Sequence, residues 1–204
     1  MTGWGRWADL TLGYHLLSRM AYVIVVGVAL TMQTRRRVFT RHAGTEAGYR
    51  RFRRIAATLM NNDGVSFVVL CVVTRNTFHL SFPPVITIGA GALLVVIGVS
   101  IKVWAAVRLG PLAYYWYDFF ALGSTPAPNP PGPYRFLKNP MYTLGYLQTY
   151  GLALAFGSMP ALLASIFAQT AILVFHYSVE KPHFDLLPLR AAGATPGVLT
   201  TKSE

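Results

Sequence analysis

Long apolar stretches with few charges constrain the fold of this chain more than any other feature. A membrane-spanning helix needs about 20 consecutive, mostly apolar residues. Five stretches come close to that length, at about 10–32, 64–80, 84–107, 141–156 and 160–179. The whole 204-residue chain has the same character, because 12% of its residues are charged whereas soluble proteins carry about 25%. We therefore expect an all-α, polytopic transmembrane helical bundle of about five spans.

The composition also excludes several classes of protein. With 53% hydrophobic residues, the chain is not a disordered or nucleic-acid-coating protein, despite its net charge of +11. Its single cysteine, Cys71, allows no intrachain disulfide and no cysteine-rich zinc site. The run Gly89-Ala90-Gly91 begins like a dinucleotide-binding loop but lies inside a predicted span. We expect these small residues to pack against a neighbouring helix.

Arginines are concentrated in the link between the first two predicted spans. Eight of them fall between positions 35 and 54: Arg35, Arg36, Arg37, Arg41, Arg50, Arg51, Arg53 and Arg54. The positive-inside rule places this link in the cytoplasm. Five spans then put the N-terminus outside, and the C-terminus and residues 108–139 inside. We expect the arginines to fix topology and to bind anionic lipid headgroups, rather than to catalyse a reaction.

An unusual aromatic run surrounds one acidic residue after the third predicted span. It comprises Tyr114, Tyr115, Trp116 and Tyr117, followed directly by Asp118. One interpretation is a belt of aromatic side chains at the membrane interface. The other is a cage for a cation, because aromatic faces attract sulfonium and ammonium groups. An acid beside a membrane is costly without a function or partner, and the sequence leaves both interpretations open.

A second polar group lies where the fourth predicted span begins. It consists of Tyr134, Arg135, Lys138 and Asn139. Pro140 suits the first turn of a helix, whose free backbone N–H groups can hold a carboxylate or a phosphate. Glu180 ends the last span at the same membrane face. The helix start can hold the carboxylate of an amino-acid moiety, and the acid beside it can hold the amino group.

A metal site is the alternative interpretation of the C-terminal segment. His176, Glu180 and His183 have the spacing of one helix face. However, Pro182 disfavours a helical conformation at Lys181, so we expect the helix to break before His183. The sequence therefore predicts no metal site.

Three motifs carry a resemblance to a known family. They are Gly132-Pro133-Tyr134-Arg135, then Lys138-Asn139-Pro140-Met141-Tyr142 with Gly145, and finally Glu180-Lys181-Pro182-His183-Phe184. Together they resemble the small integral-membrane methyltransferases that use S-adenosylmethionine. The Asn-Pro-Met-Tyr form is similar to the phosphatidylethanolamine N-methyltransferase branch, which is related to the isoprenylcysteine carboxyl methyltransferases. The resemblance covers about residues 98–187.

The resemblance implies a division of the chain and a set of functional residues. We expect N-terminal spans with the arginine-rich link over 1–97, a methyltransferase core over 98–187 and a flexible tail over 188–204. The implied residues for binding S-adenosyl-L-methionine are Tyr134, Arg135, Asn139, Pro140, Met141, Tyr142, Gly145 and Glu180. Lys181 departs from the family pattern, since many members have a second glutamate there.

The implied reaction is methyl transfer to the amine of a phosphatidylethanolamine-type membrane lipid. The amine must lose a proton before it attacks, and the candidate acceptors in the matching segment are Asp118 and Glu180. The candidate substrate-binding residues are Tyr114, Tyr115, Trp116, Tyr117 and His183. Two alternatives remain: another membrane-embedded acceptor, such as a prenylated cysteine carboxylate, a thiol or a different lipid, or a non-enzymatic lipid-binding or transport protein. We expect an integral protein of a bacterial inner membrane or the endoplasmic reticulum, with its active site facing the cytoplasm.

Overall fold

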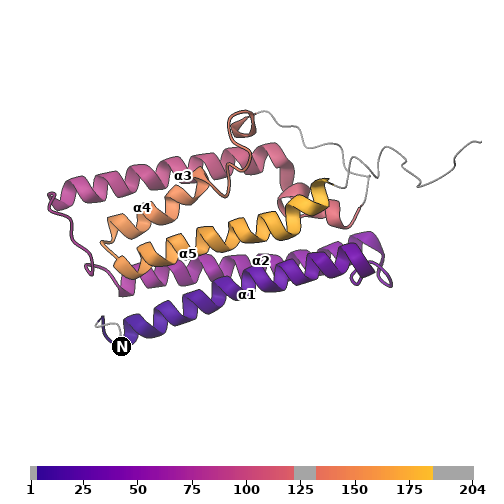
Figure 1. Cartoon of the computed structure of the whole chain (residues 1–204), viewed down its shortest axis with the longest axis horizontal. Coiled ribbons are helices and arrows are strands. Elements are labelled where there is room, and N and C mark those ends of the chain that lie inside the picture. Colours follow the sequence, from indigo (N-terminus) through magenta and orange to yellow (C-terminus); the bar gives the residue numbers. More distant parts are fainter. Residues whose placement is uncertain (1–3, 122–131, 186–204) are drawn as a thin grey trace, which may run out of the picture.

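The computed structural model describes residues 4–121 and 132–185, and every regular element in these ranges is a helix. The α-helices are α1 (Arg6–Arg36), α2 (Gly44–Val73), α3 (Pro84–Tyr114), α4 (Leu147–Ala155) and α5 (Met159–Phe175). Short 3₁₀ turns occur at η1 (Tyr117–Phe119), η2 (Pro133–Arg135) and η3 (Leu144–Tyr146), and a π-helical turn occurs at η4 (His176–Glu180). The helices lie side by side along one common direction (Figure 1). The predicted all-α bundle is confirmed.

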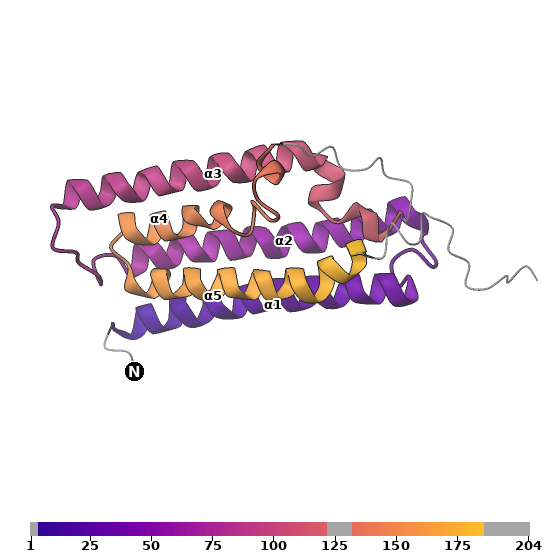
Figure 2. The ribbon, with the colours of Figure 1, turned by 45° about the horizontal axis from the view of Figure 1, so that its top comes forward.

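The number of complete spans differs from the prediction. Within the described residues, four helical segments are long and apolar enough to cross a membrane: Arg6–Arg36, Gly44–Val73, Pro84–Phe119 and Met159–Asp185. The only α-helix in the predicted fourth span is α4, which has nine residues. Because an α-helix rises 1.5 Å per residue, α4 covers less than half of the roughly 30 Å bilayer core. Figure 2 shows α4 ending partway along the bundle, where η3 precedes it. The chain thus makes its fourth passage as turns followed by a short helix.

The arginine-rich segment is more helical than predicted. α2 begins at Gly44, not near residue 64, so most of these arginines lie on α1 and α2, with a short loop between the two helices. The first half of α2 buries Tyr49, Phe52 and Ala56, whose spacing of three and four residues is that of one helix face. The arginines occupy the remaining faces, which explains why the helix extends through such a charged stretch.

α3 and α4 approach each other closely because glycines face each other. A Cβ atom on Gly91 would lie 2.7 Å from the carbonyl oxygen of Gly151, and a Cβ atom on Gly98 would lie 2.3 Å from the backbone nitrogen of Gln148. The predicted packing of small residues is therefore confirmed for Gly91, whereas Gly89 faces open space. The short α4 is held against α3 by its backbone rather than by interdigitating side chains.

The predicted hairpin between the last two apolar segments is confirmed. α4 ends at Ala155 and α5 begins at Met159. Gly157 has a φ of 59°, in the left-handed region that favours glycine. Ser158 caps α5, because its hydroxyl accepts a hydrogen bond from the backbone nitrogen of Ala161 at 3.1 Å.

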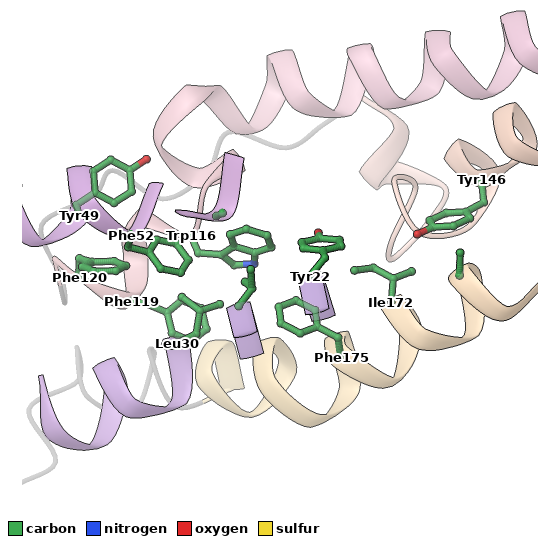
Figure 3. Close-up of a cluster of buried hydrophobic side chains, with 13 residues drawn as sticks. Tyr22, Leu30, Tyr49, Phe52, Trp116, Phe119, Phe120, Tyr146, Ile172 and Phe175 are labelled. Carbon is green, nitrogen blue, oxygen red and sulfur yellow. The ribbon is translucent and has the colours of Figure 1, made fainter. Parts of the chain in front are cut away.

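The main core cluster is largely aromatic and lies between α1, α2, α5 and the segment after α3 (Figure 3). That segment enters the bundle because α3 kinks at Gly110, which has a φ of 78° and precedes Pro111. Trp116, Phe119 and Phe120 are buried as a result. This burial rules out a simple interfacial belt for the inner part of the aromatic run.

The predicted flexible tail over 188–204 lies outside the described residues, and the division into 1–97 and 98–187 stays a prediction.

Candidate active site

Trp116 follows the α3 kink and is buried in the site. Its backbone adopts a left-handed conformation with a φ of 58°. Such a conformation is uncommon for a bulky residue and must be held by its surroundings. Here the indole nitrogen of Trp116 donates a hydrogen bond to a carboxylate oxygen of Glu180. This contact links the aromatic run to the end of α5.

Glu180 is the centre of the hydrogen-bond network. The residue is 5% exposed. The Oε1 atom that accepts from Trp116 also accepts from the hydroxyl of Tyr142 at 2.7 Å. The Oε2 atom lies 2.6 Å from Nδ1 of His176. The anion is therefore oriented by side chains from three separate segments.

The helix that carries Glu180 does not break where the sequence predicted. The π-helical turn His176–Glu180 is followed by helical residues through Asp185, so the predicted break at Lys181 is wrong. The π-helical turn changes the hydrogen-bonding register, so the missing N–H of Pro182 is tolerated there. Lys181 points away from Glu180, because its Nζ atom pairs with Oδ2 of Asp185 at 2.5 Å on the exposed side.

A cavity of about 180 Å³, called here the helix-end cavity, lies beside this network. Nine of the predicted site residues line it: Tyr114, Trp116, Asp118, Tyr134, Asn139, Pro140, Met141, Tyr142 and Glu180. They come from the end of α3, η1, η2, the turns before α4 and η4. The fold thus brings the three motifs around one cavity.

Tyr134 contributes a neutral hydroxyl to the helix-end cavity. Burial, and to a smaller extent the negative charge of Glu180, raise the pKa of the Tyr134 phenol to about 12. The phenol therefore stays protonated at neutral pH and can donate a hydrogen bond.

Four predicted residues lie outside the lining of the helix-end cavity and of the second cavity described below. Arg135 is exposed, with its guanidinium 5.9 Å from the ring centre of Phe136. Tyr117 donates a hydrogen bond to Glu46 at 2.8 Å. The other two are described next.

Gly145 and His183 pack against other groups. A Cβ atom on Gly145 would lie 3.2 Å from Cγ of Lys102, so this glycine makes room for that lysine. The ring of His183 stacks on Phe119, with 3.6 Å between ring centres. Among the described residues, no group of three potential ligand side chains could hold a metal ion.

The expected helix start at Pro140 is wrong. α4 begins at Leu147, and the residues before it form turns. The backbone nitrogens of Tyr142 and Thr143 donate to the carbonyl of Asn139 at 3.1 and 3.0 Å, and that of Gly145 donates to the carbonyl of Pro140 at 2.8 Å. These N–H groups already have partners, so a free helix N-terminus does not supply an anion site here.

A second, larger space of about 490 Å³, called here the mid-bundle cavity, adjoins the first. The two share four lining residues: Tyr114, Trp116, Met141 and Tyr142. Tyr115 lines only the mid-bundle cavity, and the guanidinium of Arg53 lies 5.2 Å from its ring centre. The four shared residues therefore form the boundary between the helix-end cavity and the mid-bundle cavity.

Charged residues of the mid-bundle cavity were missed by the sequence reasoning. Arg19, Asp63 and Lys102 line it, and an Nη atom of Arg19 lies 2.5 Å from a carboxylate oxygen of Asp63. Each of them belongs to a helix long and apolar enough to cross a membrane. An ionisable residue in such a helix is itself a signal of function, so this feature was available in the sequence.

Comparisons with known proteins agree with these motifs. The family model described as phospholipid methyltransferase matches residues 86–187. A phosphatidylethanolamine N-methyltransferase of Schizosaccharomyces japonicus is 40% identical over 138 residues, which are 65% of this chain and 15% of that protein. One of Chaetomium globosum is 31% identical over 178 residues, 81% of this chain and 18% of that protein.

The chain therefore spans less than a fifth of the length of these curated relatives. No solved structure matches it. The family match covers half of the chain and contains every residue that lines the helix-end cavity, from the end of α3 to the segment after η4. On this evidence the chain is an integral membrane protein that belongs to the phospholipid methyltransferase family.

Proposed function

We propose that this chain transfers a methyl group from S-adenosyl-L-methionine to the amine of a phosphatidylethanolamine-type membrane lipid. The observation that carries the proposal is the buried Glu180 carboxylate beside a cavity lined by all three sequence motifs. The two relatives above are phosphatidylethanolamine N-methyltransferases by name, which supports the lipid amine as acceptor. Because the chain covers a small part of those relatives, the activity is proposed from the site itself.

The chemistry of the helix-end cavity fits the donor. Glu180 supplies the anion that an ammonium group needs, and Trp116 and Tyr142 supply aromatic faces for a sulfonium. Ligand pockets usually measure about 300–1,000 Å³, so the helix-end cavity alone is small for a nucleoside-bearing molecule. The adjoining mid-bundle cavity, with about 490 Å³, provides the additional space.

The donor supplies an activated methyl group on a sulfonium when it is bound. The protein then has to hold the acceptor nitrogen at about 3–3.5 Å from that carbon, in line with the bond that breaks. It must also accept the proton that the amine loses. Asp118 lines the helix-end cavity with an exposed fraction of 7%, so we assign this acceptor role to Asp118.

The orientation follows from the arginines. Arg35, Arg36, Arg50 and Arg51 lie where α1 ends and α2 begins. The C-terminal end of α5, which is followed by η4 with Glu180, lies at the same end of the bundle (Figure 1). The positive-inside rule places this end in the cytoplasm. The same arginines are suited to anionic lipid headgroups, each worth about 1 kcal/mol near the surface. The proposed active site then faces the cytoplasm.

A radiolabel assay tests the function directly. The purified chain is incubated with methyl-tritiated donor and mixed lipid micelles, and label is counted in the organic phase. Transfer to phosphatidylethanolamine, absent in a Glu180→Ala variant, is the expected result. Label in a different lipid would identify that lipid as the acceptor instead. No transfer, in a chain that still binds the donor, would refute the proposed activity.

A further inference from the structure

The mid-bundle cavity contains more positive than negative charge. Arg19 and Lys102 line it together with one acid, Asp63. Arg19 and Asp63 are 7% and 5% exposed, and their side chains form an ion pair. Lys102 forms no ion pair with any acid in the described part of the chain. One positive charge is therefore left over in a largely apolar region, where an isolated charge is costly.

Both cations also keep hydrogen-bonding capacity. An Nη atom of Arg19 donates to the hydroxyl of Tyr146 at 3.2 Å, but its buried Nε–H has no partner. The Nζ atom of Lys102 lies 5.1 Å from the ring centre of the same tyrosine. The two cations thus flank Tyr146, which Figure 3 shows at one end of the core cluster, with Tyr22 lying between it and Trp116. The unpaired buried Nε–H of Arg19 indicates a ligand that accepts a hydrogen bond.

The cavity lies between two helices that hardly touch. α2 and α3 make few direct contacts with each other, and residues of both line the space between them. Val68 of α2 and Val99 of α3 line the cavity and are exposed, so the cavity is open between these two helices. Since both helices are apolar enough to lie in a membrane, this side of the cavity faces lipid. A ligand can enter it from the bilayer with its acyl chains left outside.

We propose that Lys102 and Arg19 bind the phosphodiester of the phospholipid acceptor in the mid-bundle cavity. The proposal rests on the proposed function and extends it to the acceptor. The phosphate carries one negative charge, which matches the surplus charge of the cavity. The amine of the headgroup then points to the shared wall of Trp116 and Tyr142, next to the cavity assigned to the donor. Arg19 of α1 and Lys102 of α3 thus supply acceptor recognition, and the three motifs supply donor binding.

The competing ligand is the carboxylate of the donor, which is also an anion. The two ligands are distinguished by Lys102→Met, which keeps the length of the side chain and removes its charge. Lys102→Arg keeps the charge, and Arg75→Met removes an exposed cation outside both cavities as a matched control. Arg19 is less suitable for substitution because it also joins α1 to α2 through Asp63.

Binding is measured without turnover, so the result does not depend on the proposed activity. Native mass spectrometry of the full chain gives the occupancy of phosphatidylethanolamine and of diacylglycerol with the same acyl chains. Equilibrium dialysis gives the affinity for labelled S-adenosyl-L-methionine. Lys102→Met should weaken phosphatidylethanolamine binding by roughly 10- to 100-fold, the usual loss for a hydrogen bond to a charged group. Diacylglycerol and donor affinities should stay unchanged, and Lys102→Arg and Arg75→Met should bind like the unmodified chain.

Three outcomes would overturn the proposal. Unchanged phosphatidylethanolamine binding in Lys102→Met would show that Lys102 does not bind the phosphate. Weaker donor binding with normal lipid binding would assign Lys102 to the donor carboxylate. Displacement of the lipid by inorganic phosphate at equal concentration would identify a site for free phosphate. A chain that passes the binding test but methylates no lipid would refute the proposed function and leave the phosphate site in place.

Discussion

Glu180→Gln is the substitution that most directly tests the site. The amide has nearly the same shape as the carboxylate, so its oxygen can still accept hydrogen bonds from Trp116 and Tyr142. Its NH₂ group can donate to Nδ1 of His176 when that nitrogen carries no proton. The network therefore stays intact, and the main change is the loss of one buried negative charge.

The size of the effect follows from two estimates. Two opposite charges about 4 Å apart attract by about 4 kcal/mol at an effective dielectric constant of about 20, which is an upper bound for the donor's ammonium group. Replacing a charge-assisted hydrogen bond by a neutral one removes about 1 kcal/mol. We expect a loss of about 2 kcal/mol, which is roughly a 30-fold weaker donor affinity.

The assay is equilibrium dialysis of labelled donor against the detergent-purified chain, with thermal unfolding measured in parallel. Glu46→Gln is the matched control, because Glu46 also accepts a tyrosine hydroxyl, at 2.8 Å, but is exposed and lines neither cavity. It should bind the donor normally. If Glu180→Gln binds the donor with unchanged affinity, Glu180 only orients Trp116 and Tyr142, and the donor's ammonium lies elsewhere.

Three further results are expected. Asp118→Asn should lower turnover by roughly 10²–10⁴, with normal donor affinity. Turnover should partly recover at high pH, where more of the lipid amine is neutral. Near-normal turnover at pH 7 would show that Asp118 is not the proton acceptor. Replacing Arg35, Arg36 and Arg37 by Gln should change membrane insertion, measured by protease accessibility, or the dependence on anionic lipids, measured by vesicle binding. A loss of donor affinity in correctly inserted protein would instead place these arginines in the active site. Gly98→Leu should destabilise the chain by about 1–3 kcal/mol through overpacking, seen as a lower unfolding temperature, because even a Cβ atom would lie 2.3 Å from the backbone of Gln148.

The helical bundle could be predicted because its signal is local. Apolar length alone identified the spans of α1, α3 and α5, and the α4–α5 hairpin followed from Gly157 and Pro160. The motif residues could likewise be assigned to one site, because Tyr134, Tyr142 and Glu180 lie in segments that a known family pattern joins.

The departures have specific physical causes. α4 is short because 139–146 form turns, whose hydrogen bonds depend on tertiary packing rather than on apolar length. α2 is long because a helix with one apolar face tolerates arginines on its other faces. Helix continues past Pro182 because a π-helical turn precedes it, and no feature of the sequence marks that change in register.

The mid-bundle charges show why a motif alone gives only part of the site. Arg19 and Asp63 are 44 positions apart and pair only when α1 and α2 lie antiparallel. Lys102 lies within the family match, but it faces them because Gly145 leaves room for its side chain. A methyltransferase that acts on a membrane lipid must recognise two ligands that arrive from different phases. We propose that the motifs bind the ligand from water, and that Arg19 and the surplus Lys102 bind the anionic ligand from the bilayer.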